Sequence, residues 1–272
     1  MKNIMSQNKK VVSVVESRHI MMEILKNVAD FCDKNGIRYT LSYGTLIGAI
    51  RHQGFIPWDD DIDIDMPRPD YEKFIKSYPQ TGPYKISAFG DKNSFLLYAK
   101  VYDSRTIKKE QGIDYVKYCP LGIDIDVFPI DGQPNDIKKF KRQNDRMRFL
   151  GHLMTIYTRP ASNRKLLSNI ANFFVKMIPY RFFCIIAKKI SQEYSFGETD
   201  YVGYISHFDV DRYRNRHKLE VFKDRIQVKF EDSYFWAPIG YQEYLTNLYG
   251  DYMQLPPVEK RVTHHCNSAY WK

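Results

Sequence analysis

The hydrophobic pattern predicts an amphipathic helix near the start of the chain. In Ile20–Cys32 apolar residues recur every three or four positions, and Gly36 follows shortly after. This spacing places the apolar side chains on one helical face, and a glycine commonly ends a helix. A strand from Arg38 to Ser42 and a short helix from Gly44 to Arg51 are expected next.

Two short segments alternate apolar and acidic residues. In Asp61–Met66 isoleucine and methionine alternate with three aspartates, and Gly122–Phe128 repeats the pattern with Asp124 and Asp126. A period of two is typical of a strand with one buried face, so the carboxylates of each segment are predicted to share the opposite face. A helix over Asp70–Ser77 is expected after the first strand.

The remaining pattern predicts one hairpin followed mainly by helices. Ser94–Glu110 is expected to form a hairpin that turns near Asp103 and Ser104. Helical periodicity then covers 135–157, two segments of 163–190 that are separated by Pro179, and 241–249. Strands in the first half and helices in the second predict an α+β fold. No repeat or low-complexity linker divides the chain, so a single domain over residues 1–272 is expected.

The charge balance predicts an anionic partner without identifying it. Lys and Arg number 41 against 32 acidic residues, which gives a net charge of +9. Nucleic acid, an anionic membrane surface and a phosphorylated substrate all fit this sign. No motif of an RNA-recognition, KH or zinc-finger module is present, so no nucleic-acid partner is predicted. The four scattered cysteines and the lack of a secretion signal favour a cytoplasmic location.

The most apolar tract, Lys165–Ile190, has two interpretations. Polar residues and Pro179 interrupt it, so it is too broken to span a bilayer. A basic, apolar pair of helices can lie peripherally at the inner face of the cytoplasmic membrane. The alternative is a pair of core helices whose charged edges face water, with Pro179 at an ordinary corner between them.

The acidic segments are the strongest candidates for chemistry. Carboxylates crowded beside a hydrophobic core repel one another, and a divalent cation relieves that repulsion. Oxygen ligands favour Mg²⁺ or Mn²⁺, and a second strand that brings Asp126 alongside the first would complete a three-carboxylate metal site. Asp124 shares the predicted face of Asp126, so either could be the third carboxylate. The alternative is a solvated acidic face that binds nothing. Asp59 is expected at the surface or behind the ligands.

The turn before the short helix is a candidate anion site. Backbone amides at a helix start bind anions, and the Thr45 hydroxyl beside Gly44 can add a donor. A Gly-Thr pair is also common in turns that bind nothing. Arg51 could clamp a phosphate or only interact with the helix C-terminus. His52 could bind phosphate, although a lone histidine is more often structural.

The segment YTLSYGTLIGAIRHQGFIPWDDDIDIDM, at 39–66, resembles the LicD family of phosphocholine transferases, which includes the fukutin-type sugar-phosphate transferases. KVYDSRT, IDVFPIDG and FWAPIGYQEYLTNLYGDYMQLPP are further matches, and together they span roughly residues 20–265. The resemblance implies a nucleotidyltransferase-like mixed-sheet core over about 20–132, with appended helices and a C-terminal part over about 133–272.

The resemblance also implies a reaction. Phosphocholine, or a related alcohol phosphate, would pass from a CDP-alcohol such as CDP-choline to a hydroxyl of a cell-surface glycan, with release of CMP. The acceptor could be lipid-linked, as in lipopolysaccharide, teichoic acid or capsule. Asp61 and Asp63 would be the metal-binding pair, Asp126 the third carboxylate, and Gly44 and Thr45 the phosphate-binding turn. A true nucleotidyltransferase that releases pyrophosphate is the alternative.

A choline head group would need aromatic faces and carboxylates, because a quaternary ammonium has no proton to donate. Tyr43 and Trp58 flank the predicted metal strand and are candidate walls, with ordinary core packing as the alternative. Lys100 could contact phosphate or lie on a solvated hairpin.

Overall fold

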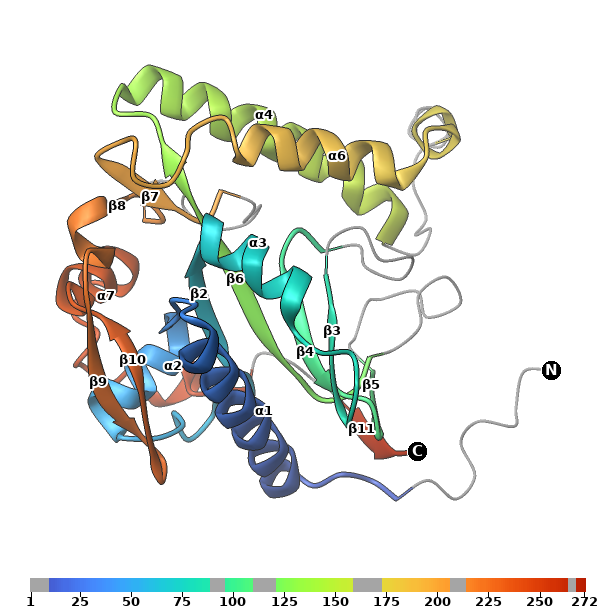
Figure 1. Ribbon diagram of the computed structural model, residues 1–272, viewed down its shortest axis with the longest axis vertical. Coiled ribbons are helices and arrows are strands. Elements are labelled where there is room, and N and C mark those ends of the chain that lie inside the picture. Colours follow the sequence, from blue (N-terminus) through green and yellow to red (C-terminus); the bar gives the residue numbers. More distant parts are fainter. Residues whose placement is uncertain (1–9, 89–95, 110–120, 159–172, 206–213, 264–267) are drawn as a thin grey trace.

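A mixed sheet of seven strands forms the centre of the fold (Figure 1). The computed structural model describes residues 10–88, 96–109, 121–158, 173–205, 214–263 and 268–272. The strands of this sheet are β1 (Thr40–Leu41), β2 (Asp63–Pro67), β3 (Tyr84–Ser87), β4 (Ala99–Asp103), β6 (Asp124–Gln133), β7 (Tyr201–Gly203) and β8 (His217–Lys218).

The long strand β6 organises this sheet. The order is β1-β2-β6-β4-β3, and β7 pairs with the far end of β6 and with β8. β2 is parallel to β6, whereas β1, β3, β4, β7 and β8 pair in antiparallel fashion. Strands and helices are not arranged as repeated βαβ units, so the predicted α+β class is confirmed.

Four further strands form two small sheets. β9 (Arg225–Phe230) and β10 (Ser233–Pro238) make a hairpin, and β5 (Thr106–Lys109) pairs with β11 (Ser268–Trp271). The predicted hairpin of 94–110 is therefore wrong in its pairing, although both strands and the turn exist. β4 already has β3 and β6 on its two edges, so β5 cannot join it and pairs with the C-terminal strand instead.

Except for α1, the helices begin and end close to the predicted positions. They are α1 (Val14–Asn35), α2 (Tyr43–Ile47), α3 (Arg68–Ser77), α4 (Ile137–Thr158), α6 (Tyr180–Ser191) and α7 (Tyr241–Tyr249). Short helical turns are the π-helical Gly48–His52 and the 3₁₀ segments Leu219–Phe222 and Val258–Lys260. Residues 163–172 of the predicted helical tract lie outside the described residues.

Local signals explain why α1 is longer than the predicted 20–32. Ser13 caps its first turn in a reciprocal capping box with Glu16. Gly36 ends it in a left-handed conformation with φ of 60°, which glycine adopts without strain. The helix thus gains a full turn before its first core residue, Ile20.

The main core lies between the sheet and α1 and α3, which Figure 1 shows in front of β2, β6 and β4. Ile24 of α1, Ile64 of β2 and Val127 of β6 are fully buried there. The predicted alternation in β2 is therefore confirmed: Ile64 and Met66 face this core, and Asp63 and Asp65 alternate with them.

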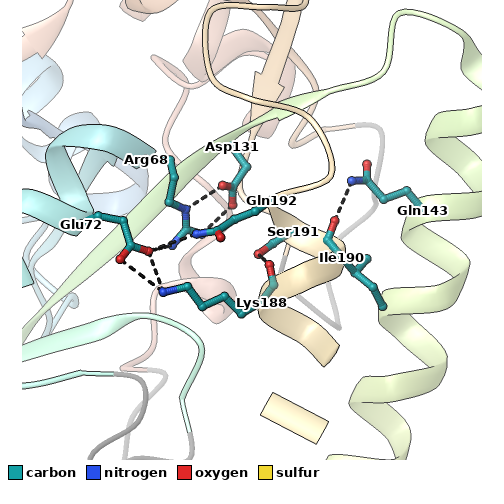
Figure 2. A network of polar contacts seen from close by, with 8 residues as sticks. All are labelled: Arg68, Glu72, Asp131, Gln143, Lys188, Ile190, Ser191 and Gln192. Carbon is teal, nitrogen blue, oxygen red and sulfur yellow. Dashed lines mark hydrogen bonds and ion pairs between the residues drawn. The ribbon is translucent and has the colours of Figure 1, made fainter. Parts of the chain in front are cut away.

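Helices α4 and α6 pack side by side as a separate layer at the top of Figure 1. Met147 and Leu150 of α4 meet Phe183 and Ala187 of α6 in a second, smaller core. Gln143 also donates a hydrogen bond of 2.8 Å to the backbone carbonyl of Ile190 (Figure 2). No helix in the described ranges is long and apolar enough to cross a membrane.

A polar network joins this helical layer to the sheet (Figure 2). The guanidinium of Arg68, on α3, donates two hydrogen bonds of 2.7 Å to the carboxylate of Asp131, which is 1% exposed on β6. Arg68 also contacts Glu72 at 3.4 Å. Glu72 in turn binds Lys188 at 3.0 Å and accepts a hydrogen bond from Gln192 next to α6. Three elements are thereby held together by charged hydrogen bonds.

We expect Arg68→Met to destabilise the protein strongly, because it leaves the Asp131 carboxylate buried without its cation. Removing one partner of a buried ion pair costs about 3–5 kcal/mol of unfolding free energy. Urea unfolding measures the loss, and adding Asp131→Asn should recover part of it.

The matched control is Lys26→Met. Lys26 forms an ion pair of 2.9 Å with Asp232, against 2.7 Å for Arg68 with Asp131, and the Asp232 side chain is 70% exposed. Such a surface pair contributes about 0–1 kcal/mol. Equal losses in Arg68→Met and Lys26→Met would contradict the assigned role of the network.

Candidate active site

A pocket of about 1560 Å³ lies between α2, the start of β2 and the C-terminal part of the chain. Carboxylates of Asp59, Asp61 and Asp63 line it on the β2 side. Its other charged lining residues are Arg51, Arg214, Asp251, Glu259, Lys260 and Arg261. Its aromatic lining residues are Tyr43, Trp58, Phe128, Tyr249 and Tyr252. Six of the predicted site residues therefore lie on one cavity: Tyr43, Gly44, Arg51, Trp58, Asp61 and Asp63.

The turn before α2 fixes the backbone of Asp63. The N–H of Ser42 donates to the Asp63 carbonyl at 3.1 Å, and the N–H of Asp63 donates to the Thr45 hydroxyl at 2.9 Å. Thr45 is 3% exposed and does not line the pocket. Its hydroxyl oxygen thus holds the carboxylate-bearing strand, a function that the predicted phosphate-binding role did not include.

Asp63, Asp126 and Lys100 form one row across three strands. Asp63 of β2 is the register partner of Asp126 on β6, and Asp126 is the register partner of Lys100 on β4. Register partners in a sheet point to the same face. The Lys100 ammonium contacts the Asp126 carboxylate at 2.6 Å. Lys100 therefore lies beside the predicted third carboxylate, in the sheet and not on a solvated hairpin.

Asp124 and Asp126 differ in their surroundings. Asp124 is 3% exposed and lies between Lys108 at 2.5 Å and Lys100 at 3.2 Å. Burial opposes ionisation of Asp124, but the two ammonium groups outweigh it and lower its pKa. Burial raises the pKa of Asp126 to about 6 although Lys100 counteracts it. Neither aspartate is among the described residues that line the pocket, but the side chain of Asp126 is 17% exposed and adjoins Asp63, which favours Asp126 over Asp124 as the third carboxylate.

The pocket carboxylates hinder one another's ionisation. Burial, followed by the charge of Asp61 and a hydrogen bond with it, raises the pKa of Asp59 to about 7. Burial and the neighbouring charges of Asp61 and Asp126 raise the pKa of Asp63 well above its ordinary value. Like charges close together in a poorly solvated site produce this effect.

Asp59 lines the pocket and shares a hydrogen bond with Asp61, so it is not the surface group that was one alternative; its other expected place, behind the ligands, stays a prediction. A Cβ at Gly44 would lie 2.5 Å from the Asp59 carboxylate, so the glycine allows this close approach. Arg18 of α1 donates to the carbonyls of Asp59, at 2.7 Å, and Pro57, at 2.9 Å. These long-range hydrogen bonds tie the loop before β2 to α1, and local sequence gives no sign of them.

The donor set suits a hard divalent cation in its chemistry. Within the described residues, no three His, Cys, Asp or Glu side chains are gathered as a metal-binding group. Asp61 and Asp63 nevertheless line one cavity, and the raised pKa of Asp63 shows that negative charge there lacks full compensation. Carboxylate oxygens are the ligands that Mg²⁺ prefers. The residues present therefore fit such an ion, and its binding stays a prediction.

Arg51 lies in the π-helical segment Gly48–His52 and contacts the C-terminal wall of the pocket, the lining residues from Leu248 to Val262. Its guanidinium donates to the carbonyls of Tyr252 at 2.5 Å and Gln254 at 3.3 Å, and to the His52 ring at 2.9 Å. Arg51 still lines the pocket, whereas His52 does not. Burial, then the charge of Arg51, lowers the pKa of His52. His52 thus accepts a hydrogen bond from Arg51 outside the pocket lining.

The aromatic candidates differ in what they contact. The Arg261 guanidinium lies over the Trp58 ring, and its central carbon is 5.6 Å from the ring centroid. Tyr43 packs against Phe128 with ring centroids 5.5 Å apart and adopts a left-handed backbone with φ of 42°. Such a conformation is uncommon for a residue other than glycine and is often found at functional sites.

The C-terminal wall was missed by sequence reasoning. Tyr249, at the end of α7, lines the pocket and is 45% exposed. Arg261 comes from a segment with no regular periodicity. The only signal available was the motif match over 235–257, which indicated the region but not the side chains.

Comparison with known proteins agrees with the predicted resemblance. Residues 36–165 match the family described as LicD/FKTN/FKRP, nucleotidyltransferase domain. The chain is 31% identical over 277 residues to the lipopolysaccharide cholinephosphotransferase LicD of Haemophilus influenzae. This alignment covers 96% of this chain and 99% of that protein.

Two shorter matches are to uncharacterised rickettsial proteins. A protein of Rickettsia typhi is 42% identical over 60 residues, which is 22% of this chain and 19% of that protein. A protein of Rickettsia prowazekii is 37% identical over 70 residues, which is 25% of this chain and 26% of that protein. These matches cover too little of either chain to carry an argument about activity.

We expect the stability of the metal-free protein to fall as the pH rises between 3.8 and about 7, because the folded state keeps a proton on Asp59 that the unfolded chain loses. Asp59→Asn removes this titration and should make the decline shallower. Urea unfolding of both proteins in a chelator, at several pH values across this window, measures the two slopes.

Asp232→Asn is the control for this pH experiment. A hydrogen bond with Lys26 at the surface lowers the pKa of Asp232, so removing that carboxylate should leave the decline in place. The same slope in the native protein and in Asp59→Asn would show that Asp59 does not hold a proton in the pocket.

Proposed function

Because the chain belongs to the LicD family, we propose that it transfers phosphocholine from CDP-choline to a hydroxyl of a cell-surface glycan and releases CMP. The Haemophilus relative is named a cholinephosphotransferase of lipopolysaccharide, and the two chains align over almost their full lengths. A lipopolysaccharide-type glycan is therefore the first acceptor to test.

The observation that carries the proposal is the charge arrangement of the pocket. Asp61 and Asp63 lie on one side, and Arg51, Arg214 and Arg261 line the same cavity. A CDP-alcohol carries a negatively charged diphosphate and, with choline, a positively charged end. A cavity that offers both signs of charge suits that combination, since guanidinium groups bind phosphate oxygens well.

Trp58 supports a cationic head group. Its ring lies within cation–π distance of Arg261, and this contact supports a role for the ring in binding a positive charge. A trimethylammonium group has no N–H, so it depends on such ring faces and on nearby carboxylates. Asp59 lines the same cavity and can supply the negative charge.

In this proposal Asp61 and Asp63 hold Mg²⁺, with Asp126 beside Asp63 as the third carboxylate. The ion would neutralise charge on the diphosphate and on the departing CMP oxygen. The hydrogen bonds of Ser42 and Thr45 to the backbone of Asp63 hold this residue in place. The fold would thereby position the metal ligand, and positioning provides most of the catalysis in phosphoryl transfer.

Asp126 is the proposed general base. The acceptor hydroxyl oxygen would form a bond to the phosphorus that carries choline, and the bond from that phosphorus to the CMP oxygen would break. The hydroxyl proton would pass to Asp126, whose pKa of about 6 leaves it mostly ionised at neutral pH. The Lys100 ammonium, 2.6 Å away, orients this carboxylate.

We expect the purified protein to release CMP from CDP-choline when Mg²⁺ and a lipopolysaccharide acceptor are present, and to lose this activity in a chelator. Chromatography of labelled substrates follows the products. A parallel reaction with CTP tests nucleotidyl transfer, which the family description also names. Pyrophosphate from CTP without CMP from CDP-choline would overturn the proposal in favour of a nucleotidyltransferase.

We expect Asp63→Asn and Asp126→Asn to lower the rate of CMP release by at least about 100-fold, since both remove a charge from the reacting centre. They should differ in donor binding. Asp63→Asn removes a proposed metal ligand and should weaken CDP-choline binding in calorimetry, whereas Asp126→Asn should retain it.

Asp30→Asn, at an exposed position of α1, removes the same charge outside the pocket and should keep native activity. Thermal melting checks that every variant is folded. Near-native turnover by folded Asp63→Asn would exclude the proposed site.

A further inference from the structure

Helix α6 and the segment before it present large apolar side chains to solvent. Phe173, Phe174 and Met177 are 63%, 63% and 67% exposed, and Phe182 and Ile185 are 52% and 44% exposed. Single exposed apolar residues are ordinary, but a group on one tract usually marks an interaction surface.

Helix α6 is already packed against the protein on one side, so the apolar side chains exposed on its other side are not the result of incomplete packing. Phe183 and Ala187 are buried against α4 in the smaller core. Phe182, Ile185 and Lys189 follow the spacing i, i+3 and i+7, which places them together on the opposite side of the helix. The helix therefore has a complete inner face and a second, outward apolar face.

Basic residues accompany the outward apolar ones. Lys176, Arg181 and Lys189 are exposed, and residues 173–192 contain no aspartate or glutamate. Lys188 is directed instead to Glu72 in the network that joins α6 to α3. We use the name α6 face for the exposed residues of the outward side of α6 and of the segment before it: Phe182 and Ile185 with Arg181 and Lys189, and Phe173, Phe174 and Met177 with Lys176.

We propose that the α6 face docks reversibly on an anionic lipid bilayer. Aromatic and aliphatic side chains enter the boundary between head groups and acyl chains, and the lysines and the arginine meet lipid phosphates. Both features are required: the basic residues provide attraction over distance, and the apolar residues provide burial. Contact would be peripheral, since no helix among the described residues can cross the bilayer.

Charge favours the bilayer over a second copy of the chain. A symmetric dimer through the α6 face would bring the exposed Arg181 and Lys189 of both copies together without an acidic residue of 173–192 to separate them. The net charge of +9 adds repulsion between copies and attraction to an anionic surface.

The inference goes beyond the proposed transferase activity and does not depend on it. Figure 1 shows α6 along the top of the molecule, apart from α2 and α7, which border the pocket. Changes on the α6 face should therefore leave CMP release from soluble substrates unchanged, while loss of the pocket carboxylates should leave membrane binding unchanged.

Co-sedimentation with vesicles tests the proposal. The native protein should pellet with vesicles that contain phosphatidylglycerol, remain soluble with phosphatidylcholine alone, and bind more weakly at high salt. Phe182→Ser with Ile185→Ser should lower the affinity for anionic vesicles by about tenfold or more. Val14→Ser with Val15→Ser is the matched control, since both valines are exposed on α1.

A charge test leaves every apolar side chain intact. The triple variant Lys176→Gln, Arg181→Gln and Lys189→Gln should lose binding at low salt. The triple variant Lys34→Gln, Lys76→Gln and Lys229→Gln removes the same charge from exposed positions elsewhere and should keep most of the vesicle binding at low salt.

Three outcomes would overturn the proposal. Native protein that stays in the supernatant with anionic vesicles at low ionic strength excludes docking. Equal losses in the two triple variants reduce the effect to net charge. A native dimer that becomes monomeric in Phe182→Ser with Ile185→Ser, without any lipid binding, assigns the α6 face to self-association.

Discussion

Mutual repulsion among carboxylates at the start of β2 is the constraint on which the rest of the structure depends. Asp59, Asp61 and Asp63 line one cavity, and Asp126 adjoins Asp63 across the sheet. The raised pKa of Asp63 shows that this grouping is unfavourable when ionised. It persists because the opposite side of β2 is fixed: Ile62, Ile64 and Met66 are fully buried beneath α1 and α3. The hydrophobic core thus holds charges where they would not gather unaided.

Positively charged side chains compensate these carboxylates more fully on one side of the site than on the other. On the β4 and β5 side, Lys100 and Lys108 contact Asp124, and Lys100 also contacts Asp126. On the pocket side, burial, followed by the charge of the neighbouring carboxylate Asp61, raises the pKa of Asp59 to about 7. Among the described residues, the carboxylates on the β4 and β5 side therefore have their charge neutralised by lysines, whereas Asp59 and Asp63 on the cavity wall do not. A cationic ligand or ion is favoured only from the cavity.

The sequence was informative where the signal was local. The alternation around Asp63 predicted β2 and its buried face, and the three-and-four spacing predicted α1, because each depends on neighbours along the chain. Pairing between distant segments was not accessible in this way. Lys100 reaches Asp126 only through the register of β4 and β6, and the loop that carries Asp59 is tied to Arg18 of α1, 41 residues earlier. The wrong hairpin at 94–110 has the same cause: a turn signal fixes a reversal but not which strand becomes the partner.

Strand β6 links the pocket to the helical layer through its length as well as its side chains. Asp126 and Asp131 are an odd number of residues apart, so they project from opposite faces of one strand. One faces the row with Asp63 and Lys100, and the other binds Arg68. A substitution between them would alter only local packing, whereas a one-residue deletion would reverse one of the two faces. The number of residues between these two aspartates therefore matters to the fold as much as their identity, because it decides which face of β6 each one occupies.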